Sequence, residues 1–311
     1  MYVITDLSEV PSDVAPSAIT IGKFDGLHHG HLWVVSQLHD EARARGLNPV
    51  VVTFDRHPAA VLAPETAPPP IVSTRQKLDL LRRQGLAATI VVPFTPEFAR
   101  LSPREFVERL LVKQLGVKLL LVGRDFRFGK GGEGDVEFLR GHAAEFGYEL
   151  IVTRDEQGPG DRRASSTWVR ELLEVGDVRT VTEVLGRYHV LAGEIVHGAK
   201  RGREIGFPTA NLSPDLEGLI PGDGVYAGWF HDGDAVYPTA VSIGNNPTFD
   251  GVPQKQVEAY VIGENLDLYG RRVQIALVER LRSMVKFEGI GPLKAQLERD
   301  VETTKRILGI A

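Results

Sequence analysis

The chain has 311 residues, a formal net charge of −5 and no cysteine. This length is typical of about two domains, each large enough to bury a core. The acidic balance argues against a general nucleic-acid binder or a binder of anionic membranes, since both rely on a broad basic surface. The lack of cysteine excludes disulfides and thiolate metal sites.

The first twenty residues contain three acidic residues and lack a basic segment followed by an apolar one, so they predict no signal peptide. No apolar run approaches the roughly 20 residues of a membrane span. Together with the missing cysteine, these features favour a cytoplasmic protein.

The N-terminal half alternates short β-rich runs with helical periodicity. The predicted strands are Ala18–Ile21, Val50–Phe54, Thr89–Val92, Lys118–Val122 and Glu149–Val152. The predicted helices are Gly30–Arg45, Thr74–Gln84, Ser102–Leu115 and Glu137–Phe146, with a further helical pair from Thr167 to about Leu185 that breaks at Gly176. This alternation predicts an α/β domain, a doubly wound parallel sheet covered by helices on both faces.

The pattern changes near Gly186, so we expect one domain over residues 1–186 and a second over residues 187–311. The second domain has closely spaced β-rich runs without helices between them, which favours a small antiparallel β-barrel. These runs are His189–Val196, Gly224–Phe230, Ala235–Ile243, Gln256–Val261 and Arg272–Val278. A terminal helix is expected to pack an apolar stripe on the barrel. That stripe consists of Ile290, Leu293, Leu297, Val301 and Leu308.

The stretch Ile19–His31 indicates a strand that ends in a glycine-containing loop and leads into a helix. In an open α/β sheet such a junction is where ligands bind, and a helix N-terminus favours an anion. His28 and His31 are three residues apart, so both side chains can face one side of the first turn and donate hydrogen bonds to phosphate oxygens. The stretch therefore suits transfer at a phosphate.

Three other interpretations of the histidines stay open at this point. His28, His29 and His31 with Asp25 are compatible with a metal site. The histidines are also compatible with a helix-capping loop at the surface. A catalytic base is the third interpretation, although no serine or cysteine nucleophile motif accompanies them.

Polar residues end other predicted strands of this half. They lie in Val52–Pro58 and Leu121–Gly129, while Ala164–Arg170 opens a helix with hydroxyl groups and an arginine one turn in. Hydroxyls, free N–H groups and a guanidinium at one helix start are typical of a phosphate site. Taken singly, an ordinary helix cap at Ser165 or Ser166 and core packing of Phe126 and Phe128 explain these residues better than a binding site does.

The second half contains a basic, glycine-containing loop that leads into Phe207-Pro208-Thr209-Ala210-Asn211. Glycines let backbone wrap phosphates, although the Walker A pattern is absent. Thr209 and Asn211 offer the hard oxygen ligands that suit Mg²⁺. Alternation along Val257–Tyr260 places Glu258 and Tyr260 on one face of a strand, where a carboxylate can accept a proton from a hydroxyl. A surface turn and an exposed strand glutamate are the alternatives.

Several motifs, in this order, resemble the bacterial bifunctional riboflavin kinase/FAD synthetases over nearly the whole chain. In the first half they are G-x-F-D-G-L-H-x-G-H, T-F-D-x-H-P, G-x-D-F-x-F-G and S-S-T-x-x-R. In the second half they are G-F-P-T-A-N after the glycine loop, G-V-Y, I-G-N-N-P-T-F and V-E-A-Y. The resemblance implies a nucleotidyltransferase domain followed by a riboflavin kinase barrel.

For the first domain, the resemblance implies that His28 and His31 contact ATP phosphates and stabilise charge as pyrophosphate leaves. It places Ser166 and Arg170 at a second phosphate-binding signature. The remaining residues implied to bind nucleotide or flavin are Gly22, Phe24, Asp25, Asp55, His57, Asp125, Phe128 and Thr167.

For the second domain, the resemblance implies that Glu258 is the general base on the riboflavin 5′-hydroxyl and that Thr209 and Asn211 position Mg²⁺ with ATP. Further nucleotide-binding residues implied there are Gly198, Lys200, Gly202, Gly206 and Pro208. The expected reactions convert riboflavin to FMN and FMN to FAD, so both flavins are substrates or products rather than prosthetic groups. The expected partners are riboflavin, FMN and ATP, with no nucleic acid and no membrane, and the oligomeric state stays open.

Two other functions are weighed against this one. A different nucleotidyltransferase with the H-x-G-H motif is disfavoured by the F-P-T-A-N motif. A flavin-binding carrier without catalysis is disfavoured by the retention of Glu258, Thr209, Asn211, His28 and His31.

Overall fold

The computed structural model describes residues 1–154, 162–198, 206–244 and 255–310. The chain divides into two compact units, Met1–Ser165 and Ser166–Ala311. The domain boundary expected at residue 186 stays a prediction.

The first unit is built on a six-stranded parallel sheet with the strand order β1-β4-β3-β2-β5-β6. The strands are β1 (Tyr2–Ile4), β2 (Ser17–Ile21), β3 (Asn48–Phe54), β4 (Ala88–Val92), β5 (Val117–Gly123) and β6 (Glu149–Thr153). All five predicted strands are confirmed. The sixth, β1, was not predicted because three residues at a chain end carry no periodicity.

Helices connect these strands. They are α1 (His29–Arg45), α2 (Ala59–Leu62), α3 (Thr74–Arg82), α4 (Pro103–Glu105), the π-helix η5 (Phe106–Gln114) and α5 (Val136–Phe146). Short 3₁₀ turns are η1 (Leu7–Glu9), η2 (Ser12–Val14), η3 (Pro64–Thr66), η4 (Phe98–Arg100) and η6 (Lys130–Gly132). Ser73 and Ser102 cap α3 and α4, each with a complete capping box.

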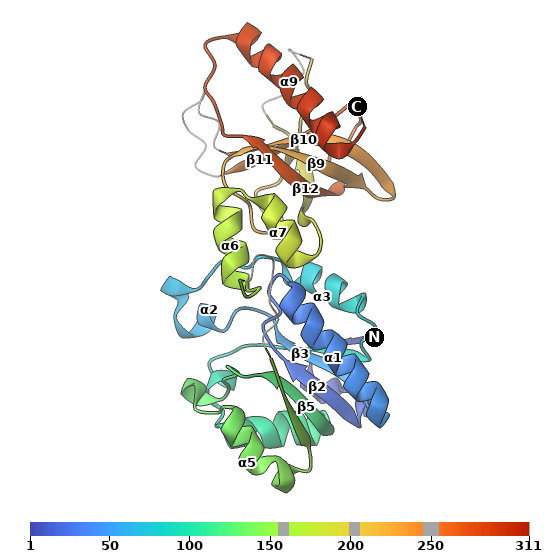
Figure 1. Ribbon diagram of the computed structural model, residues 1–311, viewed down its shortest axis with the longest axis vertical. Coiled ribbons are helices and arrows are strands. Elements are labelled where there is room, and N and C mark those ends of the chain that lie inside the picture. Colours follow the sequence, from blue (N-terminus) through green and yellow to red (C-terminus); the bar gives the residue numbers. More distant parts are fainter. Residues whose placement is uncertain (155–161, 199–205, 245–254, 311) are drawn as a thin grey trace. The chain divides into compact units, whose positions relative to one another are not determined.

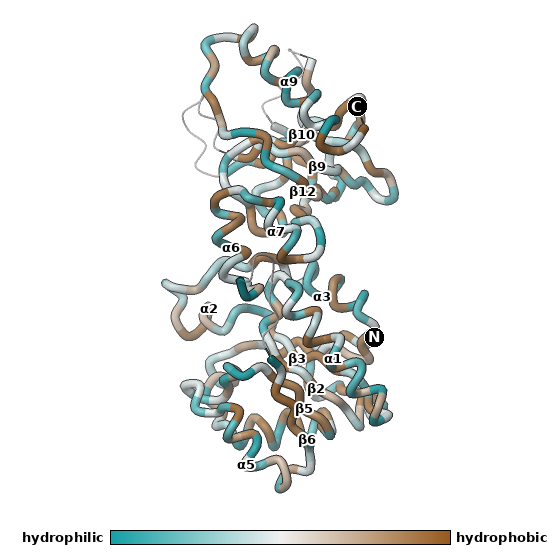
Figure 2. Tube along the Cα trace, in the orientation of Figure 1, coloured by the Kyte–Doolittle hydropathy of each residue, from teal (hydrophilic) through white to brown (hydrophobic). Residues whose placement is uncertain are grey.

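Alternate residues of the central strands bury into two separate cores, one on each face of the sheet. Ile19, Val50 and Leu120 belong to one core, which the helices η5 and α5 cover. The intervening residues of the same strands belong to the other core, which α1 and α3 cover (Figure 1). Figure 2 shows the strongly hydrophobic β5 inside this unit. The predicted doubly wound sheet is therefore confirmed.

Strand β2 lies between β3 and β5, so the chain leaves β2 toward one side of the sheet and returns on its other side at β5. The reversal of strand order creates a crevice beyond the carboxyl ends of the strands. The loop after β2, which carries the histidines, begins at this point.

The second unit contains a closed antiparallel barrel with the order β10-β11-β8-β7-β12-β9. Its strands are β7 (His189–Val196), β8 (Ala210–Leu212), β9 (Gly224–Asp232), β10 (Ala235–Gly244), β11 (Gln256–Val261) and β12 (Arg272–Arg282), and its helices are α6 (Ser166–Val175), α7 (Val178–Leu185) and α9 (Ile290–Leu308). The predicted barrel with a terminal helix is confirmed. Strand β8 was not predicted, although it closes the barrel between β7 and β11.

The helices α6 and α7 are held against the barrel of the second unit. The N–H of Gly222 donates to the carbonyl of Leu173 over 2.7 Å, and Arg280 of β12 donates to the carbonyl of Val175 over 3.3 Å. A Cβ on Gly176 would lie 2.4 Å from the Tyr226 hydroxyl, so the turn between the two helices requires glycine.

The terminal helix α9 is attached mainly by polar groups. The carboxylate of Asp300, which is 3% exposed, accepts three hydrogen bonds from the Arg282 guanidinium. The predicted apolar stripe is only partly buried, and Ile290 at its start is 66% exposed. The expectation that Ile290 packs on the barrel is wrong because the most buried positions of the helix, Asp300 and Thr304, lie two turns and more downstream.

Candidate active sites

The loop after β2 presents two stacked imidazoles. His28 is the N-cap residue of α1, and its ring lies 3.8 Å from the ring of His31, centroid to centroid, with an interplanar angle of 21°. The Phe24 ring lies 5.1 Å from the His31 ring. The spacing of three residues thus brings both histidines to one side of the first turn, as predicted.

The backbone of this loop adopts conformations that side chains rarely take. Phe24 and Leu27 have φ of 49° and 44°, although each side chain is almost fully buried. Backbone strain of this kind persists only where the surroundings enforce it, and it is typical of functional loops. A Cβ on Gly30 would lie 3.3 Å from the His28 ring, so glycine there leaves room for the imidazole.

The histidine cluster lies in an electropositive, desolvated environment. Burial lowers the pKa of His31 well below its usual range, and nearby basic groups lower it further. These groups are His28, Lys23, Lys77 and Arg163. The buried Nδ1 of His31 has no hydrogen-bond partner among the residues that the structure describes. A positive, desolvated environment with an unpartnered polar ring atom is suited to an anion.

Lys77 is a component of this site that the sequence analysis missed. It lies on the buried side of α3 and is only 8% exposed. Its ammonium donates to the carbonyl of Phe54 over 2.7 Å, with the Thr53 hydroxyl at 3.3 Å and the Lys23 carbonyl at 3.4 Å. The only signal in the sequence is a lysine four residues before Leu81, on the apolar side of the helix.

Two of the three carboxylates predicted near the site hold its loops in place. Asp25 accepts from the backbone N–H of Ile71 over 3.0 Å, which ties the histidine loop to the segment before α3. Asp55 accepts from the N–H of Phe94 over 2.8 Å and forms an ion pair with Arg56. Burial opposes ionisation of Asp55, but the hydrogen bonds from Arg56 and Phe94 outweigh it and lower its pKa.

The other predicted residues of the first unit fall in different surroundings. Gly22 lies under the Phe24 ring, since a Cβ there would be 3.1 Å from that ring. The Nδ1 of His57 accepts from the backbone N–H of Ala59 over 3.1 Å. Asp125 forms an exposed ion pair with Arg163.

Phe128 is 7% exposed and packs in the core, where its ring stacks on Phe126 at 5.4 Å and contacts Phe106 at 5.2 Å. Phe126 is the more accessible ring of the stacked pair. Direct flavin contact by Phe128 stays a prediction.

Ser166, Thr167 and Arg170 lie in the first turn and a half of α6, in the second unit. The structure therefore attaches this signature to the helices that pack on the barrel. Its role in binding phosphate stays a prediction.

A second polar cluster lies on the outer face of the barrel. Glu258 of β11 stands directly opposite Asn211 of β8, and the Thr209 hydroxyl lies 3.4 Å from the Glu258 carboxylate. The side chains of β11 alternate between half-buried and buried, which confirms that Glu258 and Tyr260 share a face. A Cβ on Gly198 would lie 2.4 Å from the Asn211 amide nitrogen, so the start of the glycine loop contacts this cluster.

Part of the predicted nucleotide-binding loop lies outside the described residues. Lys200 and Gly202 belong to that part, as does the I-G-N-N-P-T-F motif beyond Gly244. Gly206 has φ of 86°, a conformation that favours glycine, and Pro208 lines a hollow at the barrel.

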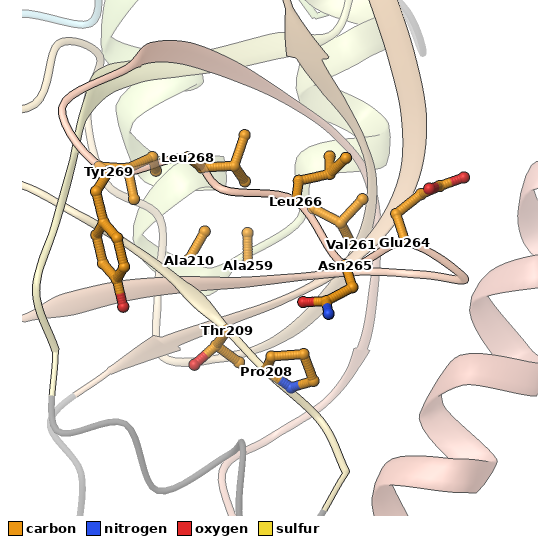
Figure 3. Close-up of a pocket in the computed structure, with 11 residues that line it drawn as sticks. Pro208, Thr209, Ala210, Ala259, Val261, Glu264, Asn265, Leu266, Leu268 and Tyr269 are labelled. Atoms are coloured by element: carbon orange, nitrogen blue, oxygen red, sulfur yellow. The ribbon is translucent and has the colours of Figure 1, made fainter.

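This hollow lies beside the polar cluster rather than under Glu258. In Figure 3, Pro208 and Thr209 form one rim, Leu266 and Leu268 lie opposite, and Tyr269 and Asn265 flank the opening. Ala259 lines the hollow, so β11 turns its inner face to it and its outer face, with Glu258, away. Thr209 borders the hollow and also lies beside the Glu258 carboxylate.

Comparison with known proteins matches two regions of the chain to two family models. The family model described as FAD synthetase matches residues 10–168, and the model described as riboflavin kinase matches residues 185–308. The bifunctional riboflavin kinase/FMN adenylyltransferase of Escherichia coli is 37% identical over 99% of this chain and 97% of its own length. The chain belongs to the bifunctional riboflavin kinase/FMN adenylyltransferase family. The resemblance inferred from the motifs is thereby confirmed.

Another bifunctional enzyme and a solved structure are also similar to this chain. The bifunctional enzyme of Bacillus subtilis is 33% identical over 96% of this chain and 94% of its own length. A crystal structure described as a macrolide-efflux protein from Streptococcus pneumoniae has a TM-score of 0.83 and 28% identity, and it covers 98% of both chains. Family membership supports a role in flavin cofactor biosynthesis.

One finding limits the interpretation of the histidine loop as a metal site. Within the described residues, no group of three or more His, Asp or Glu side chains lies close enough to hold a metal ion. The histidine loop therefore offers no metal site of that kind, because Asp25 is engaged with Ile71.

No helix in the described ranges is long and apolar enough to cross a membrane.

Proposed function

We propose that the second unit transfers the γ-phosphate of ATP to the 5′-hydroxyl of riboflavin, and that the first unit joins the resulting FMN to AMP from a second ATP. The products are FMN and ADP in the first step, and FAD and pyrophosphate in the second. The observation that carries this proposal is that each unit holds its own polar cluster. The first unit holds the stacked histidines, and the second holds Thr209, Asn211 and Glu258.

In the kinase step, Glu258 acts as the general base. Its carboxylate takes the proton of the riboflavin 5′-hydroxyl as that oxygen attacks the γ-phosphorus, and the bond from the γ-phosphorus to the bridging oxygen of ADP breaks. The register with Asn211 fixes the position of the carboxylate on a rigid strand. The Thr209 hydroxyl, 3.4 Å away, keeps it oriented.

Thr209 and Asn211 would hold Mg²⁺ together with the ATP phosphates. Their hydroxyl and amide oxygens are hard ligands that fit this ion. The two residues are separated by one position in the chain, and Gly198, which has no Cβ, leaves room for the Asn211 amide. Mg²⁺ uses few protein ligands when phosphates and waters complete its shell, which agrees with the lack of a dense acidic group in the described residues. The ion would neutralise charge on the phosphates.

In the adenylylation step, a phosphate oxygen of FMN attacks the α-phosphorus of ATP and the bond to pyrophosphate breaks. This transfer needs no protein nucleophile, only positioning and charge stabilisation. Burial keeps His31 neutral in the free protein, and the arrival of a polyanion favours its protonation. His28 and His31 then donate hydrogen bonds to the phosphates as negative charge develops on the leaving group.

We also propose that Ser166, Thr167 and Arg170 bind phosphate, since hydroxyls and a guanidinium at the start of α6 suit an anion. The substrates of the whole protein are then riboflavin, FMN and ATP. A cytoplasmic location agrees with the absence of cysteine.

Incubation of the protein with riboflavin, ATP and Mg²⁺, followed by chromatographic separation of the flavins, tests both reactions at once. Formation of FMN and then FAD is expected. FMN alone would contradict the proposed role of the histidine site, and unchanged riboflavin together with unchanged FMN in a parallel incubation would contradict both roles. Chelation with excess EDTA is expected to stop both reactions, and added Mg²⁺ to restore them.

A further inference from the structure

Lys77 is a buried cation whose presence the fold of α3 does not require. Leu81, one turn later on the same helix, is fully buried in the core, and an apolar residue at position 77 would continue that packing. A buried ammonium loses its hydration and is found in proteins only where other groups replace the lost water. Burial indeed lowers the pKa of Lys77, while Asp25 and Asp55 partly offset this effect.

The acceptors of Lys77 belong to the two strand ends that frame the histidine loop. Phe54, whose carbonyl lies 2.7 Å from the Lys77 ammonium, is the last residue of β3. Lys23, whose carbonyl lies 3.4 Å from the ammonium, is in the loop directly after β2. The Thr53 hydroxyl links the ammonium to the Lys23 carbonyl, since it donates to that carbonyl over 3.1 Å and lies 3.3 Å from the ammonium. One side chain therefore ties α3 to the carboxyl ends of two neighbouring parallel strands.

The segment that Lys77 holds leads directly into the strained part of the loop. Phe24, next to Lys23, has φ of 49°, and Leu27, next to His28, has φ of 44°. Such conformations persist only when their surroundings enforce them. Two contacts anchor this loop: the Lys77 ammonium donates to the Lys23 carbonyl, and the Asp25 carboxylate accepts from the N–H of Ile71.

The charge of Lys77 also acts on the histidine pair. The His31 ring lies among His28, Lys23, Lys77 and Arg163, and each of them disfavours its protonation. The Lys77 ammonium is held in place by hydrogen bonds inside the protein. A fixed, desolvated positive charge stabilises developing negative charge better than a solvated one.

We propose that Lys77 is a positioning residue of the adenylylation step, which holds the loop from Lys23 to His28 in its reactive conformation and supplies a fixed positive charge beside His31. The proposal rests on the proposed function of the histidine site. It predicts an effect on the rate of FAD formation rather than on ATP affinity, because ground-state binding is shared among several basic groups.

The test compares Lys77→Met and Lys77→Arg with Arg75→Met, which removes an exposed charge from the same helix. In the full chain, Lys77→Met is expected to lower kcat for FAD formation about tenfold to a hundredfold, with KM for ATP within about threefold of wild type. Lys77→Arg, which keeps the charge and the donors, is expected to recover at least about a third of the wild-type kcat. Arg75→Met is expected to match wild type.

Two further readouts separate positioning from general stability. Riboflavin phosphorylation by the same polypeptide reports on the second unit and is expected to be unchanged in every variant. NMR titration of His31 in Lys77→Met is expected to show a higher pKa than in wild type, because one neighbouring cation is lost while burial, His28, Lys23 and Arg163 remain.

A folded Lys77→Met with wild-type kcat for FAD formation, or with a defect confined to KM for ATP, would overturn the proposal. If Lys77→Met does not fold, Lys77→Arg decides, and a folded arginine variant that has lost kcat overturns it as well. Failure of the proposed function is recognised separately, since the wild-type protein would then form no FAD from FMN and ATP.

Discussion

Asn211 on β8 and Glu258 on β11 stand directly opposite each other in an antiparallel register, although 46 residues separate them in the chain. Strand β8 is only three residues long, and its pairing with β11 and β7 closes the barrel. The same backbone pairing that completes the fold thus brings the proposed magnesium ligand to the proposed base.

Replacement of Glu258 by glutamine is expected to lower kcat for riboflavin phosphorylation by about 10²- to 10⁴-fold, because the amide cannot accept the hydroxyl proton. FAD formation from supplied FMN is expected to persist. Both rates are measured by flavin separation on the same protein sample. Glu194→Gln, an exposed strand glutamate of the same barrel, serves as the control. A normal kinase rate in Glu258→Gln would show that another group takes the proton.

Removal of both imidazoles in a His28→Ala, His31→Ala double variant is expected to impair FAD formation and to spare the kinase. FAD formation should fall by at least about a hundredfold through the loss of hydrogen-bond donors to the phosphates, while riboflavin phosphorylation is retained. His29→Ala removes the exposed histidine between them and is expected to leave both rates unchanged. A loss of FAD formation in His29→Ala equal to that in the double variant would point to the fold of the loop rather than to the two rings.

Gly198→Ala is expected to impair the kinase without unfolding the barrel. The new Cβ would lie 2.4 Å from the Asn211 amide, and the flexible amide would move away from it. A displacement of this size is expected to lower riboflavin phosphorylation by about ten- to a hundredfold with little change in Tm. Gly141→Ala, where a Cβ meets open space on α5, is expected to raise stability by about 0.5–1 kcal/mol and to leave the kinase unchanged. A fully active Gly198→Ala would contradict the assigned position of Asn211.

The second unit is expected to lose stability below about pH 6.5 through His189. Burial lowers the pKa of this histidine to about 4, despite its hydrogen bond to the Leu219 carbonyl. The folded state binds this proton more weakly than the unfolded chain, so the stabilisation is complete above the unfolded pKa and declines as the pH falls toward 4. The loss amounts to about 3 kcal/mol at most.

Denaturant unfolding of the wild-type protein and of His189→Gln between pH 7.5 and 4 measures this contribution. Glutamine keeps a donor for the Leu219 carbonyl but does not titrate, so the variant is expected to show a flatter pH dependence. Parallel curves for the two proteins would assign the acid sensitivity to other groups.

Asp300→Ala is expected to destabilise the second unit by about 3–5 kcal/mol, because it leaves the Arg282 guanidinium without its charged partner at a largely buried position. Glu302→Ala breaks an exposed pair with Lys305 on the same helix and is expected to cost less than about 1 kcal/mol. Thermal unfolding compares the two variants, and similar Tm values would show that the Arg282–Asp300 pair contributes no more than a surface pair.

The sequence by itself determined the elements whose signal is local. Runs of β-branched residues predicted five of the six strands of the first unit, and the spacing of His28 and His31 predicted that their rings share one side of a helical turn. Both follow from the backbone geometry of single elements, which depends on neighbouring residues only. The motifs, in their order along the chain, indicated the family by resemblance.

Only the tertiary structure decided the features that depend on distant partners. The burial of Lys77 is set by acceptors at the end of β3 and in the loop after β2, which precede it by more than twenty residues. Strand β8 is too short to predict, because its pairing with β7 and β11 rather than its periodicity makes it a strand. Asp300 is buried because Arg282 lies where the helix lands on the barrel. In each case the free energy comes from contacts between remote segments, which no local pattern encodes.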